Sequence, residues 1–195
     1  MPLVDRRSKA DYINKDRKRI KLSKVVDKKL SLYPWKYIFQ CFLAMLTMLV
    51  VLSYLDFIEH TAIISSFGAT SFITFTMPRR YHSDAKRLIG GYLTGIAVGV
   101  FFHHIARIPC VMANVCADHL SFALFGSIAV FFAILLMVIL DTEHPPAAGI
   151  ALGLVLNSFD INTIMFVIAA IVLITIVKNT LKPFMIDLLY DLEFS

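Results

Sequence analysis

The sequence predicts an all-α polytopic membrane protein with about six membrane-inserted helical segments, two of them short and broken. Its 195 residues are 58% hydrophobic, which is more than the core of a soluble domain requires. Two nearly uncharged runs, residues 36–55 and 120–140, are each long enough as helices to cross a hydrocarbon core of about 30 Å. Two further uncharged runs, residues 88–105 and 161–177, are slightly shorter. None of these runs shows the period-two alternation of a membrane β-barrel.

Residues 1–35 form a basic arm, which we expect to lie in the cytoplasm. Residues 1–36 hold twelve Lys and Arg against four Asp, a balance of +8. A basic segment directly before a membrane span is typical of the cytoplasmic side, where it contacts anionic lipid headgroups. Nucleic-acid binding is the rival interpretation of such an arm. The position of the arm next to a span argues against that interpretation.

The transmembrane domain is expected to cover residues 36–178. Within it, a short apolar segment at residues 61–77 follows the first run, and a second one at residues 144–156 follows the run at 120–140. Residues 179–195 alternate apolar and acidic side chains, which predicts an amphipathic tail helix along the membrane interface.

Charge also predicts the topology. The loop at residues 78–87 and the two lysines Lys178 and Lys182 are basic, like the arm. Placing all of them on one side puts both termini in the cytoplasm, at what we expect to be a bacterial inner membrane. Both short segments must then cross. The 13 residues of 144–156 reach only about 20 Å as a helix, so a re-entrant loop is the alternative.

The chain shows the order long run, short run, long run twice, over residues 36–105 and 120–177. Aligning the halves places Gly68 against Gly149. This order predicts an inverted repeat of three plus three segments. Short, Gly- or Pro-interrupted segments at matching positions of two halves are the best sequence indication of a transporter's binding site.

The second short segment begins with His144, Pro145 and Pro146. Two consecutive prolines cannot lie inside a helix, but they can start one. A helix start carries partial positive charge and free N–H donors, and it can therefore bind an anion. A protonated imidazole there would add a full charge. Glu143 is expected either to pair with a cation of the 78–87 loop, Arg79 or Lys86, or to be solvated.

The candidate substrate-binding residues are those of the two short segments. They comprise His144, Pro145, Pro146, Ser66, Gly68, Thr70, Gly149 and Glu143. We expect His144→Ala to reduce flux strongly while leaving folding nearly intact. Transport of the solute should also depend on pH in the range in which an imidazole side chain titrates.

Three fragments in order resemble the HPP family of integral membrane proteins. They are Ser66-Phe67-Gly68-Ala69-Thr70, Lys86-Arg87-Leu88-Ile89-Gly90-Gly91 and Glu143-His144-Pro145-Pro146-Ala147. The resemblance covers roughly residues 36–178. It implies a helical membrane domain, usually described as having four spans, and a connection with nitrite transport in chloroplasts and cyanobacteria. Family members often carry a proline where Ala85 stands and a histidine where Tyr92 stands.

These observations favour a permease or channel for a small anion, with nitrite as the candidate. The alternatives are a membrane-embedded enzyme using His144 and Glu143, and a scaffold or regulatory subunit that acts through its basic arm. No nucleophile–base set, P-loop or dinucleotide fingerprint occurs in the sequence, so we expect no enzyme activity and no cofactor. His103 and His104 point about 100° apart on a helix, which argues against a shared metal.

The remaining expectations concern assembly. Gly91, Gly95 and Gly99 recur every fourth residue, a pattern that allows close helix packing. We therefore expect a homo-oligomer that uses this glycine ladder. Cys110 and Cys116 share one loop, and either a disulfide or two thiols fits the sequence.

Overall fold

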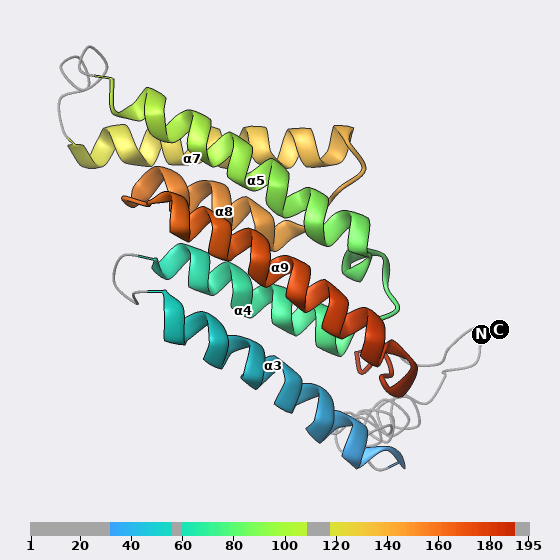
Figure 1. Ribbon diagram of the computed structural model, residues 1–195. Coiled ribbons are helices and arrows are strands. Elements are labelled where there is room, and N and C mark those ends of the chain that lie inside the picture. The colour runs from blue at the N-terminus through green and yellow to red at the C-terminus, as the bar shows by residue number, and fades with distance from the viewer. Residues whose placement is uncertain (1–31, 56–59, 109–117, 190–195) are drawn as a thin grey trace, which may run out of the picture.

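The computed structural model describes residues 32–55, 60–108 and 118–189, which form six α-helices packed side by side (Figure 1). The helices are α3 (Pro34–Tyr54), α4 (Thr61–Thr76), α5 (Ala85–Ala106), α7 (Asp118–Ile139), α8 (Pro145–Leu156) and α9 (Ile161–Leu181). Two 3₁₀ turns, η1 (Tyr81–Ser83) and η2 (Lys182–Phe184), precede α5 and follow α9. The predictions for the basic arm over 1–31 and for Cys110 and Cys116 fall outside the described residues.

Four of these helices are long and apolar enough to cross a membrane, namely α3, α5, residues 122–139 of α7, and α9. The other two, α4 and α8, have 16 and 12 residues. This confirms the predicted architecture of four long and two short segments. Each short segment forms one uninterrupted helix.

Proline and a side-chain cap set several helix starts. Pro145 and Pro146 open α8, as the sequence predicts, and Pro34 is likewise the first residue of α3. Asp160 caps α9, because its carboxylate accepts the backbone N–H of Thr163 at 2.8 Å.

Successive helices run in opposite directions, so their termini gather at the two ends of the bundle (Figure 1). We call the end that carries Arg87 and Lys182 the basic end, and the opposite end, with His60 and Asp160, the distal end. The starts of α3, α5 and α8 lie at the basic end. The basic residues that predict the topology are therefore gathered at one end, and the orientation in a membrane and the inverted repeat stay predictions.

Helix α8 lies in the centre of the bundle, in contact with α4, α5 and α7. The glycine ladder of α5 faces it. A Cβ added at Gly99 would lie 2.9 Å from the Cα of Ala151, and one added at Gly91 would lie 2.8 Å from the Cβ of His144. The expectation that this ladder joins two copies of the chain is therefore wrong, because α8 of the same chain already covers it.

The tail differs from the predicted amphipathic helix. The α-helix ends at Leu181, two residues before Pro183, and residues 185–189 are not helical. Pro183 lacks the N–H that a continuing helix would need. Beyond the helix, the tail backbone pairs with the buried side chain of Gln40 in α3. The Gln40 amide donates to the Ile186 carbonyl at 2.9 Å and accepts the Ile186 N–H at 3.3 Å. Residues 190–195 fall outside the described residues.

We predict that Gly95→Ala destabilises the protein. The added methyl would meet the backbone carbonyl of Ala147, which cannot move without shifting α8. Such overpacking costs about 1–3 kcal/mol. The matched control is Gly68→Ala, whose methyl would meet only the Met48 side chain at 3.9 Å. Thermal unfolding in detergent should show a lower Tm for Gly95→Ala and an equal or higher Tm for Gly68→Ala. Equal values for both variants would contradict this packing.

Candidate functional site

His144 lies between α7 and α8, and its ring is completely buried. Its Nδ1 atom is 3.1 Å from the carbonyl oxygen of His82, and its Nε2 atom is 2.9 Å from the Thr70 hydroxyl. A carbonyl oxygen can only accept a hydrogen bond, so Nδ1 carries the proton and donates it. In the neutral ring, Nε2 then accepts the hydroxyl proton of Thr70. Complete burial disfavours the charged imidazolium.

The hydrogen bonds continue from His144 into α5. The Thr70 hydroxyl oxygen is 2.8 Å from the hydroxyl oxygen of Tyr92, and both side chains are fully buried. Because Thr70 donates to His144, it accepts from Tyr92. The resulting chain, which we call the Tyr92–Thr70–His144 chain, joins α5, α4 and the start of α8. Tyr92 was not among the candidate site residues, although a tyrosine in an otherwise apolar run could have indicated it.

The start of α8 does not offer the free N–H donors that the sequence predicts. Pro145 and Pro146 have no N–H, and the N–H of Ala147 donates to the His144 carbonyl at 2.9 Å. At most the N–H of His144 itself is left for an anion. The carboxylate of Glu143 also lies next to this positive helix end. An anion site made of backbone donors is therefore not present here.

Glu143 has partners other than the expected Arg79 or Lys86. Its carboxylate accepts the Tyr81 hydroxyl at 2.8 Å and lies 3.6 Å from Nε of Arg87. Its own backbone N–H and the Tyr81 hydroxyl lower the pKa of Glu143. Glu143 therefore stays ionised and fixes η1 to the start of α8.

Asp141 and Glu143 share the partners Tyr81 and Arg87. Together with Tyr81, Lys86 and Arg87 they form what we call the polar cluster. The Asp141 carboxylate binds Lys86 at 2.7 Å and Arg87 at 2.5 Å, and it accepts the Tyr81 hydroxyl at 2.9 Å. Hydrogen bonds from Lys86 and Tyr81 lower the pKa of Asp141 to about 2. The guanidinium of Arg87 also stacks on the Tyr81 ring, 3.1 Å from its centroid.

The backbone of Asp141 is strained. Its φ of 54° lies in the left-handed region that favours glycine. The N–H groups of Thr142 and Asp141 donate to the carbonyls of Met137 and Val138, at 2.9 and 3.3 Å. This is a Schellman motif with aspartate at the usual glycine position. The carboxylate also lies at the negative end of α7. The bonds of Asp141 to Lys86, Arg87 and Tyr81 offset both the backbone strain and the repulsion from the helix end.

The polar cluster holds the η1 turn over His144. The single hydroxyl proton of Tyr81 is shared between both acidic residues, and the next residue, His82, supplies the carbonyl that accepts from the His144 ring. Ser83 ties the same turn to α4, because its hydroxyl donates to the Met77 carbonyl at 2.7 Å. As a result, the carbonyl of this turn stays on the buried His144 ring.

The other candidate residues separate into two groups. Gly149 faces Ser66 of α4, whose hydroxyl donates to the Ala62 carbonyl at 2.8 Å. Ser66, Gly149, Thr70 and His144 thus share the contact between α4 and α8. Gly68 faces Met48 of α3, so it does not take part in this contact.

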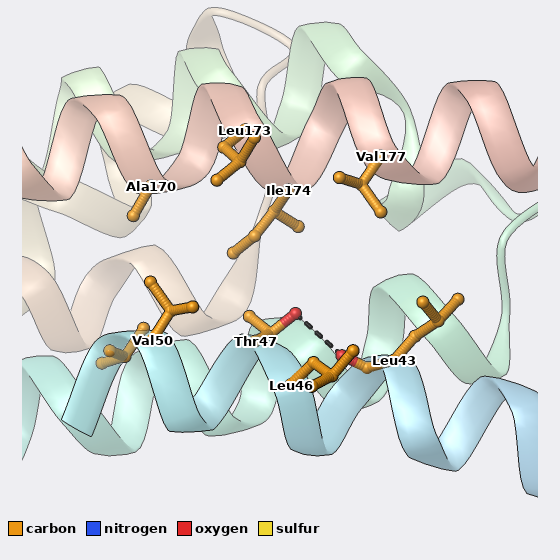
Figure 2. Close-up of a pocket in the computed structure, with 9 residues that line it drawn as sticks. Leu43, Leu46, Thr47, Val50, Ala170, Leu173, Ile174 and Val177 are labelled. Atoms are coloured by element: carbon orange, nitrogen blue, oxygen red, sulfur yellow. Dashed lines mark hydrogen bonds between the residues drawn. The ribbon is translucent and has the colours of Figure 1, made fainter. Parts of the chain in front are cut away.

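A separate cleft of about 180 Å³ lies between α3 and α9 (Figure 2). Its lining is aliphatic apart from Thr47, whose hydroxyl donates to the Leu43 carbonyl at 3.0 Å. The lining therefore offers no free hydrogen-bonding side chain to a polar solute.

The family model described as HPP, transmembrane region, matches residues 30–183. None of the curated proteins and none of the solved structures compared with the chain matches it.

We predict that Asp141→Asn weakens the acid dependence of stability. The folded-state pKa of Asp141 lies below its ordinary value of 3.8. The contribution of the ionised Asp141 to the free energy of unfolding is therefore complete above that value and is lost as the pH falls toward 2. Between about pH 4 and pH 2, the wild-type Tm in detergent should fall further than that of Asp141→Asn. Equal falls would show that Asp141 has no ion-pair role in stability.

Proposed function

The chain belongs to the HPP transmembrane family, and from this premise we propose that it is a permease or channel for a small anion, with nitrite as the candidate. The family's connection with nitrite transport supports the choice of solute. The chain is an integral membrane protein with four long candidate spans. The proposed site lies at the start of the His-Pro-Pro helix and comprises His144, Thr70 and Tyr92.

The observation that carries this proposal is the buried Tyr92–Thr70–His144 chain within apolar helices. Polar side chains at membrane depth are costly and typically mark solute or proton pathways. Both hydroxyls can rotate, so each can donate to an anion in place of its present partner. Ser66 and Gly149 lie in the same contact between α4 and α8 and would border the bound solute.

The neutral His144 ring changes the expected role of this residue. It supplies no fixed positive charge, but its Nε2 atom is a hydrogen-bond acceptor. An acceptor suits the proton that accompanies the anion of a weak acid. We propose that the anion binds together with its proton, as the weak acid: the hydroxyls of Tyr92 and Thr70 donate to its oxygens, and its own O–H donates to Nε2 of His144. The pH dependence of flux then follows the solute's own acid–base equilibrium and shows no step in the imidazole range.

The proposal extends to the surroundings of the protein. Both termini face the cytoplasm of a bacterial inner membrane, and the basic arm contacts anionic lipids. The chain acts as a homo-oligomer, joined through faces other than the covered glycine ladder. It transports and has no catalytic role, and it binds no nucleic acid.

The sharpest test of the site is Tyr92→Phe. It removes one hydroxyl and leaves the bond between Thr70 and His144 in place. Losing one hydrogen bond to the solute should lower saturable nitrite uptake into liposomes by about tenfold. The matched control is Tyr54→Phe, since Tyr54 is 55% exposed and lies at the distal end of α3. Flux through protein-free liposomes is subtracted at each pH, because nitrous acid crosses membranes unaided.

Wild-type uptake equal to the protein-free background, for nitrite and for other small anions, would overturn the proposed function. Equal uptake by Tyr92→Phe and wild type would remove the Tyr92–Thr70–His144 chain from the mechanism. His144→Ala is a poorer test than the sequence suggests. Its ring joins Thr70 to the His82 carbonyl, so its loss should also lower the Tm.

A further inference from the structure

Unpaired polar groups are concentrated on one helix of the bundle. Among the described residues, the buried side-chain nitrogens and oxygens without a hydrogen-bond partner belong to four residues. These are His60, Ser71, Thr74 and Arg87, of which Arg87 lacks a hydrogen-bond partner only at Nε, the atom that lies 3.6 Å from the Glu143 carboxylate. His60 is the N-cap of α4, and Ser71 and Thr74 lie within α4. All three are at least nine-tenths buried.

The two unpaired hydroxyls, of Ser71 and Thr74, differ from other helix hydroxyls of this chain, which donate to their own helix. Serine and threonine in membrane helices usually donate to the carbonyl four residues earlier. Ser66, Thr94 and Thr175 do so here, at 2.8, 2.8 and 2.7 Å. Ser71 and Thr74 make no such bond. A buried polar group without a partner in a native structure needs an explanation, such as a transient partner.

Position on α4 connects these groups to the proposed site. Thr74 follows Thr70 by one turn on the same helix face, and Ser71 is adjacent to Thr70. His60 stands at the other end of the helix, where it lines a hollow together with Ser158, Phe159, Asp160 and Thr163. From His60 to Thr74 the helix rises about 21 Å. The polar groups therefore follow α4 along most of its length.

We propose that α4 lines the solute path, with Ser71 and Thr74 as hydroxyl ligands beyond Thr70 and His60 at the distal entrance. This inference rests on the proposed function. Hydroxyls donate hydrogen bonds without adding charge, which suits a small anion that must bind and leave again. Ile63 and Phe67, both fully buried, lie between His60 and Thr70 on α4 and close the path in this arrangement.

The first test uses Ser71→Ala and Thr74→Val. Neither change breaks a hydrogen bond of the folded protein, so the Tm of each variant should equal or exceed that of the wild type. Saturable nitrite uptake should fall by about tenfold in each. The matched control is Thr175→Val on α9, whose hydroxyl is buried but bonded to the Ile171 carbonyl. Uptake by this control should stay at the wild-type level.

The second test does not depend on transport. Ser71→Cys and Thr175→Cys are made in a chain whose three native cysteines are replaced by serine. A small hydrophilic thiol reagent should label Ser71→Cys in liposomes and leave Thr175→Cys unlabelled, because only the former would contact a hydrated path.

The two tests separate this inference from the proposed function. Absent wild-type uptake overturns the function, whatever the labelling shows. With wild-type uptake present, an unlabelled Ser71→Cys overturns the α4 path. Unchanged uptake by both Ser71→Ala and Thr74→Val overturns it as well.

Discussion

The close packing of α8 against α4 and α5 is the constraint on which the rest of the structure depends. In a lipid environment, helices gain little hydrophobic free energy from association, so close van der Waals contact between backbones has to hold them. Gly95 and Gly99 on α5, and Gly149 on α8, remove the side chains that would keep the backbones apart. The start of α8 is thereby brought beside Tyr92 and Thr70.

The polar cluster at the basic end depends on the same contact. Asp141 and Glu143 precede α8, and Tyr81 and Arg87 lie at the approach to α5 and in its first turn. Bringing these helices together places the two carboxylates on the Tyr81 hydroxyl and the guanidinium. The strained backbone of Asp141 persists because these bonds over-determine its position. The η1 turn is held in consequence, and its carbonyl selects the tautomer of His144.

Helix α4 supports the close contact with α8, and it also carries two buried hydroxyls without partners. Its Ser66 side faces Gly149 and supports the close contact with α8. Thr70 completes the buried hydrogen-bond chain, whereas Ser71 and Thr74 remain unpaired. Unpaired hydroxyls weaken the fold, and a bundle selected for stability alone would have no use for them. A helix that exchanges partners during transport would need them.

Much of the fold follows from the sequence alone. The four long runs, the two short ones and the helix start at Pro145 and Pro146 depend on local hydrophobicity and on the geometry of proline. The family resemblance, carried by three short fragments, is confirmed over residues 30–183. The same reasoning named His144 and Thr70 among the candidates on the two short segments.

Tertiary structure decided which residues meet. Gly68 and Gly149 align in the sequence but face Met48 and Ser66, because a helix face is set by packing against its neighbours. Tyr92 entered the site through the contact of α5 with α8, and the glycine ladder was covered by the same contact. Pro183 ends the last helix locally, but the course of the tail beyond it is set by Gln40, more than 140 residues away, which pairs with the backbone of Ile186. Sequence periodicity records which faces are apolar, but it does not record which partner covers each face.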